Sequence, residues 1–339
     1  MSAMAAGNRL ALLGLVLGAG AVLAAGLGSS FLPPGRVVAA LAGGGAPMDS
    51  VIIWTLRLPR VVLAVLTGMA LALAGALLQR VTRNPVAAPS VLGVTDGAAL
   101  GVVAFLWIFS DDANALTVSI HWQPLAAMIG AFGFAALVAL LTLLDPGGRS
   151  PLRIILYGVA LAALAKAAVT LMMILGPIYR ANQALTWLTG SVSAAHWSDA
   201  ATVAAGLALS IPALVALRLP LRQIALDAES AAATGLALGR TQAALLSLSV
   251  LLTALAVSQV GAVGFVGLVA PHAARYIHGQ FAPGYLVSTA LIGGLMVLGA
   301  DTLARIIAAP LELPAGALTA LVGAPVFLWL LLKGRRAHG

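Results

Sequence analysis

The chain consists of long apolar stretches separated by short polar segments, and this pattern ties it to a membrane. Of its 339 residues, 61% are hydrophobic and 8% are charged, whereas soluble domains carry roughly 25% charged residues. So few charges cannot cover a water-soluble surface, and lipid must therefore solvate most of the exterior. The sequence predicts an all-α integral membrane protein.

Ten stretches meet or approach the length of about 20 apolar residues that a membrane-spanning helix needs. They are 9–29, 60–80, 91–109, 123–144, 152–175, 196–217, 240–259, 262–277, 283–303 and 315–332. Pro89 and Pro271 interrupt two of them near the start, and broken helices are tolerated in membranes only where protein or a cavity surrounds them. We therefore expect these two stretches to face the interior. Glycines that permit close helix packing are Gly68, Gly75, Gly97, Gly101 and Gly158.

Lysine and arginine are unevenly distributed between the two sides of the predicted bundle. With the N-terminus in the cytoplasm, twelve of the 18 basic residues lie inside, five lie outside and Lys166 lies within a stretch. Cytoplasmic loops carry an excess of Lys and Arg, so we expect both termini in the cytoplasm and an even number of spans. The inside group is Arg9, Arg80, Arg83, Arg149, Arg153, Arg218, Arg222, Arg240, Arg275, Lys333, Arg335 and Arg336, and the outside group is Arg36, Arg57, Arg60, Arg180 and Arg305.

Three simpler interpretations are disfavoured. The first stretch follows Arg9 like a signal peptide, but we expect a retained span because its polar start is short and many spans follow. The net charge of +8 does not predict nucleic-acid binding, because the basic residues are scattered singly among apolar runs. The absence of cysteine excludes disulfides and thiolate sites.

The sequence also lacks the motifs of an energy-converting enzyme. Its only lysines, Lys166 and Lys333, lie outside any Walker A phosphate loop, and no His-Glu-x-x-His or Gly-x-Ser-x-Gly motif occurs. Ion-driven carriers usually bury carboxylates near the midplane, and the only candidates, Asp96 and Asp301, lie near span ends. If the chain moves a solute, we expect its energy source on another polypeptide.

Four blocks of residues stand out along the chain. They are Arg57-Leu58-Pro59-Arg60 with Arg83-Asn84-Pro85-Val86, then Trp187-Leu188-Thr189-Gly190-Ser191, then the run from Gly261 to His272, then Asp301-x-x-Ala304-Arg305 with Glu312-Leu313-Pro314. Together they resemble the FecCD family of permeases, the transmembrane subunits of type II ABC importers for iron-siderophore complexes, haem and cobalamin. The resemblance extends from about Arg57 to Lys333. One block alone is unspecific, whereas all four in order are specific.

The resemblance implies a type II ABC importer permease fold of ten helices, here a single permease domain over 1–339. It also implies a second permease subunit (a homodimer or a paralogue heterodimer), two cytoplasmic ATPases that bind ATP and Mg, and a periplasmic substrate-binding protein. No cofactor is expected in this chain, and its location would be the bacterial inner membrane. The second block is closer to the siderophore branch, so we expect a ferric siderophore as cargo. Haem, cobalamin, an ion-gradient-driven carrier and a membrane-embedded enzyme remain alternatives.

The resemblance assigns Arg57, Arg60 and Arg305 to docking of the binding protein. At these motif positions the family's arginines meet carboxylates on the binding protein, and guanidinium groups form charge-assisted pairs with carboxylates. The alternative is that they anchor helix ends at the membrane interface.

The inside segment of about 219–240 resembles the coupling helices that contact the ATPases. Asp227 and Glu229 suit a helix N-terminus, Ser230 and Thr234 follow, and Gly235 suits a C-terminal cap. The alternative is an ordinary amphipathic surface helix.

Asn84 and Val86 match gate positions at the cytoplasmic mouth of the family's pathway, where leucine is more common at the second position. Pro85 disfavours helix at Asn84, so the preceding helix should end here, and a purely structural turn is the alternative. Lys166 is the only charge in the middle of a stretch, and an unpaired ammonium there costs about 2.5–3.5 kcal/mol. We expect it either to contact an anionic chelate in the pathway or to pair with a polar group on a neighbouring helix.

Overall fold

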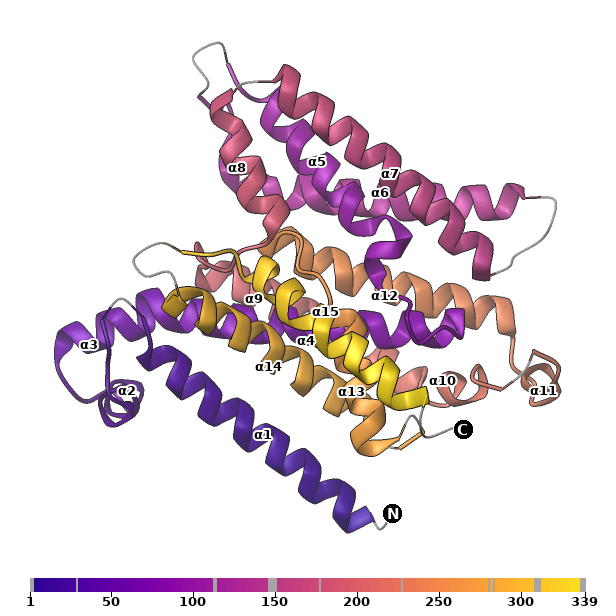
Figure 1. Cartoon of the computed structure of the whole chain (residues 1–339), viewed down its shortest axis with the longest axis horizontal. Helices are drawn as coiled ribbons and strands as arrows, with labels where there is room; N and C mark the ends of the chain where they lie inside the picture. The colour runs from indigo at the N-terminus through magenta and orange to yellow at the C-terminus, as the bar shows by residue number, and fades with distance from the viewer. Residues whose placement is uncertain are drawn as a thin grey trace. The chain divides into compact units, whose positions relative to one another are not determined.

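The computed structural model describes residues 3–28, 30–111, 115–145, 151–176, 178–226, 228–279, 281–282, 284–307 and 312–335. Regular secondary structure in these ranges is helical, apart from one isolated antiparallel bridge between Ser110 and Leu116. Figure 1 shows the helices coloured along the chain. The predicted all-α class is confirmed.

Each of the ten predicted stretches corresponds to one helix. Seven helical segments among the described residues are long and apolar enough to cross a membrane, and two shorter ones, Val94–Ile108 and Ala315–Trp329, are also apolar. The predicted stretch 262–277 forms a helix of only 13 residues. The ten helices are α1 (Ala3–Gly26), α4 (Leu58–Thr82), α5 (Val94–Ile108), α6 (Gln123–Leu144), α7 (Pro151–Leu175), α9 (Trp197–Ala216), α12 (Leu238–Val260), α13 (Val266–His278), α14 (Tyr285–Ile307) and α15 (Ala315–Arg335).

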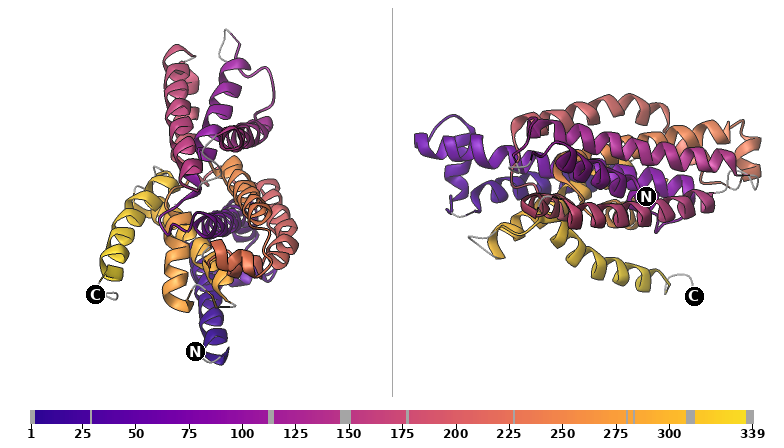
Figure 2. Two further views of the ribbon diagram at one scale, coloured as in Figure 1. Left: turned by 90° about the vertical axis from the view of Figure 1, so that its right-hand side faces the viewer. Right: turned by 90° about the horizontal axis from the view of Figure 1, so that it is seen from above.

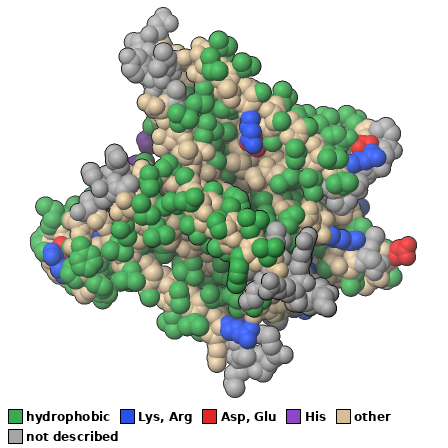
Figure 3. Space-filling model, viewed as in Figure 1, with side chains coloured by type: hydrophobic (Ala, Val, Ile, Leu, Met, Phe, Trp, Pro, Cys, Tyr) green, Lys and Arg blue, Asp and Glu red, His purple; other side chains and the backbone are tan. Residues whose placement is uncertain are grey.

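The outer surface of these helices is apolar. Figure 3 shows a face dominated by hydrophobic side chains, with charged groups isolated among them. Leu164 of α7, Ile174 of α7 and Leu209 of α9 are 64%, 72% and 80% exposed. Soluble monomers rarely expose large contiguous apolar patches, whereas lipid solvates such side chains well. The exposed leucines and isoleucines are thus the lipid-facing surface of a membrane protein.

The chain divides into two compact units. The first comprises Met1–Leu73, Gly190–Leu207 and Val263–Gly339. Within it, α1 lies along α14, and α13 and α15 also pack against α14. The N-terminal end of α1 and the C-terminal end of α15 point to the same side in Figure 1, as an even number of spans requires. The single permease domain stays a prediction.

Three short helical segments precede α4 in this first unit. They are α2 (Pro34–Leu41), α3 (Pro47–Val51) and the π-helix η1 (Ile52–Arg57). Prolines begin α2 and α3, where the missing N–H removes no helical hydrogen bond. Val37 and Ile53 are fully buried in the core that also contains Ala24 of α1. These segments therefore attach the C-terminal end of α1 to the start of α4.

The second unit comprises Ala74–Thr189 and Ala208–Ala262. Here α5 packs against α6 and α7, and α12 packs against α6; Figure 2 gives two further views of these helices. A Cβ on Gly97 of α5 would lie 2.6 Å from the carbonyl oxygen of Gly130 on α6, so the glycine contact predicted from the sequence is real. The unit also contains η2 (Pro89–Leu92), α8 (Ile178–Thr189), α10 (Pro220–Gln223) and α11 (Ala228–Ala233).

The interruption predicted at Pro89 is present, whereas α13 continues through Pro271 without a break. Pro89 begins the 3-10 helix η2, Gly93 then adopts a left-handed conformation with φ +72°, and α5 starts at Val94. Pro271 lies inside α13. Both prolines are buried, as expected for positions that face the interior of the protein.

Candidate functional site

Five charged side chains form one cluster in the first unit, where α4 begins and α14 ends. We call Arg57, Arg60, Asp301, Arg305 and Glu312 the arginine cluster. Nε of Arg60 donates to Oδ1 of Asp301 at 2.9 Å, and its Nη1 donates to Oε1 of Glu312 at 2.9 Å. Nε of Arg305 lies 3.3 Å from Oδ2 of Asp301. The Asp301 carboxylate therefore neutralises two guanidinium groups that are 7% exposed, while being 1% exposed itself.

Two arginines of this cluster also bind the C-terminal end of α1. Nη1 of Arg57 donates to the carbonyl oxygens of Ala25 and Gly26 at 2.8 and 2.9 Å. Arg305 donates to the carbonyl oxygens of Leu27 and Ala24 at 3.0 and 3.1 Å. The last carbonyls of a helix lack partners within it and carry partial negative charge. Both arginines therefore cap α1 and join it to α4 and α14.

The sequence assigned Arg57, Arg60 and Arg305 to partner docking, and the structure places all three side by side at one end of the first unit. They are 7%, 6% and 8% exposed. Their guanidinium groups bind groups of this same chain. Glu312, whose side chain is 50% exposed, is the member of the cluster that an outside molecule can reach.

The segment predicted to contact the ATPases contains two short helices, α10 and α11. Gly235 has φ +81°, donates its N–H to the carbonyl of Ala232, and is followed by Leu236, which donates to Ala231. This pattern is the Schellman motif of a helix C-terminus, so the predicted cap is present. Glu229, Ser230 and Thr234 are exposed, and Asp227 lies outside the described residues.

The predicted gate residues lie directly after α4, which ends at Thr82, as Pro85 predicts. The Asn84 side-chain oxygen accepts the N–H of Val86 at 3.0 Å, a local turn in which an Asn side chain replaces a backbone carbonyl. Val86 is 41% exposed. Nε of Arg83 donates to the carbonyl of Ile224 at 3.3 Å. The turn is thereby bound to the residue that follows α10.

Lys166 lies in the middle of α7 and forms an ion pair with Asp96. Its Nζ is 3.7 Å from Oδ1 of Asp96, in the first turn of α5. The lysine side chain is 72% exposed, and the aspartate side chain is 17% exposed. The expectation that a neighbouring helix supplies a polar partner is met. Contact with a chelate remains a separate hypothesis.

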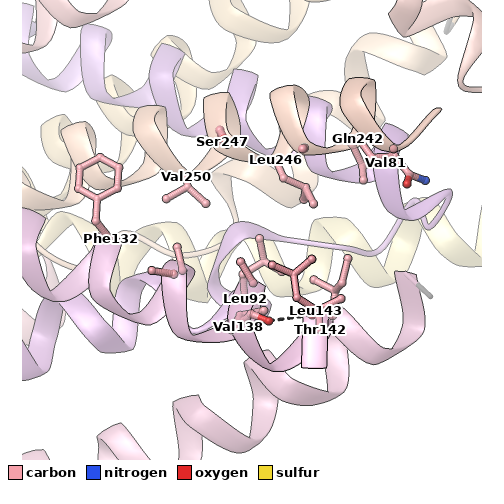
Figure 4. Close-up of a pocket in the computed structure, with 16 residues that line it drawn as sticks. Val81, Leu92, Phe132, Val138, Thr142, Leu143, Gln242, Leu246, Ser247 and Val250 are labelled. Carbon is pink, nitrogen blue, oxygen red and sulfur yellow. Dashed lines mark hydrogen bonds between the residues drawn. The ribbon is translucent and has the colours of Figure 1, made fainter. Parts of the chain in front are cut away.

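A cavity of about 650 Å³ opens in the second unit between α6 and α12. Figure 4 shows Leu246 and Val250 of α12 on one side and Val138 and Thr142 of α6 on the other. The Thr142 hydroxyl donates to the carbonyl of Val138. None of the residues that line it is acidic, basic or histidine. The cavity is therefore lined by apolar and neutral polar side chains.

The described residues contain no group of three or more His, Cys, Asp or Glu side chains close enough to hold a metal ion. Sequence reasoning missed the pairing of Asp301 with both Arg60 and Arg305, although the spacing Asp301-x-x-x-Arg305 is the helical i,i+4 spacing of ion pairs. Glu312 belongs to the fourth sequence block, but the sequence indicated no function for it. Sequence reasoning also missed Asp96 as the partner of Lys166, because no local pattern connects residues on different helices.

Comparisons with known proteins agree with this architecture. A family model described as the FecCD transport family matches residues 15–333. The chain is 43% identical over 331 residues to the probable siderophore transport system permease protein YfhA of Bacillus subtilis (strain 168), covering 97% of this chain and 95% of that protein. It is 41% identical over 317 residues to the achromobactin transport system permease protein CbrC of Dickeya dadantii (strain 3937), covering 93% and 88%.

The fold also matches a solved structure. A chain of a metal-chelate type ABC transporter in an inward-facing conformation aligns with a TM-score of 0.83 and 29% identity, covering 96% of this chain and 99% of that chain. The family match and the structural match each cover nearly the whole chain. Such permeases are not themselves catalytic, because ATP is handled by a partner ATPase. This chain therefore belongs to the FecCD transport family and is a multi-pass membrane permease of a bacterial ABC importer.

Proposed function

We propose that this permease carries a ferric siderophore across the inner membrane. The observation that carries the proposal is the 43% identity, over 97% of this chain, with a protein named as a siderophore transport permease. Two copies of this chain, or this chain and a paralogue, would enclose the pathway, with two cytoplasmic ATPases and a periplasmic binding protein completing the importer.

Reconstitution in vesicles tests this function. The chain, its ATPase, its binding protein and, where one exists, its paralogue are expected to accumulate a ferric siderophore only when ATP is supplied on the ATPase side. Vesicles without the ATPase should accumulate nothing, even with an imposed proton or sodium gradient. A ligand screen on the binding protein identifies the cargo, and selective binding of haem or cobalamin would refute the siderophore assignment.

We propose that the binding protein docks at the arginine cluster by exchanging carboxylates. Arg57 and Arg305 hold α1 in place. Arg60 donates the N–H of its Nη1 to the half-exposed Glu312. A carboxylate of the binding protein that displaces Glu312 would form a charge-assisted pair with Arg60. In this proposal Arg60 contacts the binding protein directly, and Arg57 and Arg305 position it.

Replacing Glu312 with Gln should therefore strengthen docking, because the incoming carboxylate no longer competes with a charged one. We expect the affinity for the binding protein to rise by about threefold to tenfold, with a smaller effect at high salt. Pull-down or surface binding at two salt concentrations measures this. Weaker binding by Glu312→Gln would mean that Glu312 itself contacts the partner, contrary to the exchange proposal.

The coupling assignment of 219–240 also stays a proposal. It is supported by the exposed residues Glu229 and Ser230 on α11 and Thr234 directly after it. The bond from Arg83 to Ile224 also links this segment to the turn at Asn84. Asp227 was assigned together with them. Movement of an ATPase against α11 would thereby reach the end of α4.

Gly235→Val should uncouple ATP hydrolysis from transport. Valine is strained at φ +81°, although space for its Cβ exists, so the cost falls on the conformation of the cap rather than on packing. We expect membrane expression within about twofold of wild type and a loss of transport of about tenfold or more, with ATPase activity retained. Gly264→Val, at another open glycine without a positive φ, is the control. Equal transport by both variants would contradict the coupling role.

We propose Asn84 and Val86 as part of the cytoplasmic gate, supported by the exposed Val86 side chain. Because the natural chain has no cysteine, Val86→Cys can be labelled specifically. Labelling from the cytoplasmic side that changes with the nucleotide state supports a gate. Identical labelling in all nucleotide states would leave only the structural turn.

A further inference from the structure

Lys166 and Asp96 form an isolated charged pair on an otherwise apolar surface of the second unit. Lys166 is the only charged residue between Arg153 and Arg180 in the sequence. Its Nζ lies 3.7 Å from Oδ1 of Asp96, whereas charge-assisted N–H···O bonds are typically about 2.7–2.9 Å. An ammonium group has three N–H donors. The pair therefore leaves donors of Lys166 available to a further oxygen acceptor.

This pair cannot face lipid. The Lys166 side chain is 72% exposed in the middle of a span of 24 residues, Leu152–Leu175. Charged side chains at this depth face a bundle interior or a water-filled cavity. The side of α7 that carries Lys166 also carries Thr170, one turn further on, which is exposed and donates to the carbonyl of Lys166 at 2.9 Å. Leu164 precedes Lys166 by two residues and therefore lies on the opposite side of the helix. Its side chain is 64% exposed and suits contact with lipid.

The incomplete pairing favours water over a tightly packed protein contact at this surface. A buried ion pair within a dry interface is stable only when its remaining donors and acceptors are satisfied. Water satisfies the free donors of Lys166 without further contacts. The surface of α7 around Lys166 is therefore best explained as part of an aqueous passage.

We propose that Lys166 and Asp96 form a carboxylate-exchange site for cargo in transit. Lys166 would leave Asp96, contact an anionic oxygen of the chelate, and return to Asp96 when the chelate moves on. Asp96 positions the ammonium between passages, and its negative charge opposes that of the anion, so that a chelate oxygen bound at Lys166 is released again rather than trapped. The ligand class is an iron chelate with an accessible carboxylate oxygen. This inference rests on the proposed transport of an iron chelate.

Uptake of two matched chelates tests the exchange. The probes are a ferric chelate that carries a free carboxylate and the same chelate with that carboxylate converted to an amide. In vesicles with the full importer, Lys166→Met should lower uptake of the carboxylate form about tenfold relative to wild type, with less than twofold change for the amide form. Taking each ratio to wild type removes any preference of the binding protein. An equal loss for both chelates would overturn the proposal.

A second pair of variants tests which surface is wet. In the cysteine-free chain, Thr170→Cys should react with a membrane-impermeant hydrophilic thiol reagent, whereas Leu164→Cys should not. Absence of reaction at position 170 would overturn the aqueous site. This labelling needs no transport. If wild-type vesicles fail to take up any iron chelate while Thr170→Cys still reacts, the proposed function fails and the wet surface stands.

Discussion

Asp301→Asn should lower the free energy of unfolding of the permease by about 3–5 kcal/mol, because it removes the charge that neutralises two buried guanidinium groups. Asp301 is fully buried and lies within 3.3 Å of both Arg60 and Arg305. Asparagine keeps the size of the side chain but leaves two cations facing each other. Arg305 also caps α1, so the end of α1 should loosen. Thermal unfolding of the purified protein in detergent measures the effect.

Glu312→Gln is the matched control for this prediction. Glu312 pairs with the same Arg60, but its side chain is 50% exposed, so solvent screens the pair. Such pairs contribute roughly 0–1 kcal/mol. If Asp301→Asn and Glu312→Gln prove equally stable, the buried cluster does not carry the stability ascribed to it, and its arginines are free for another role.

Hydropathy and local turn chemistry predict the secondary structure of this chain well. Lipid contact requires about 20 apolar residues in sequence, so the stretches are visible without any tertiary knowledge. The end of α4 before Pro85 and the cap at Gly235 follow from the conformational limits of single residues. Each of these features depends on neighbours along the chain.

The partners of the charged side chains could not be predicted in this way. Arg57 donates to carbonyls of residues 25 and 26, and Arg60 pairs with Asp301, 241 positions away. Nothing in a local pattern indicates which helix end lies beside which arginine. Lys166 and Asp96 are separated in the same way. The sequence thus identified the residues of the site, whereas their contacts follow only from how the helices pack.

Gly293→Ala should separate α4 from α14 and destabilise the permease. A Cβ on Gly293 would lie 2.3 Å from the carbonyl oxygen of Gly68 and 2.4 Å from the Cβ of Ala72. A backbone carbonyl cannot be moved aside by rotating a side chain. The two helices must therefore move apart along their contact. Overpacking of this kind costs about 1–3 kcal/mol or more.

Gly299→Ala supplies the control on the same helix. Gly299 is exposed, and nothing lies within 4 Å of the position that its Cβ would take, so one added methyl group meets no neighbour. Alanine is also the better helix former by about 0.8–1.0 kcal/mol. Gly299→Ala should therefore unfold at the same temperature as the natural chain or a higher one, while Gly293→Ala unfolds several degrees lower. Equal melting of the two variants would mean that α4 and α14 do not touch at Gly68 and Gly293. The contact between Arg60 and Asp301, which the same two helices carry, would then be absent as well.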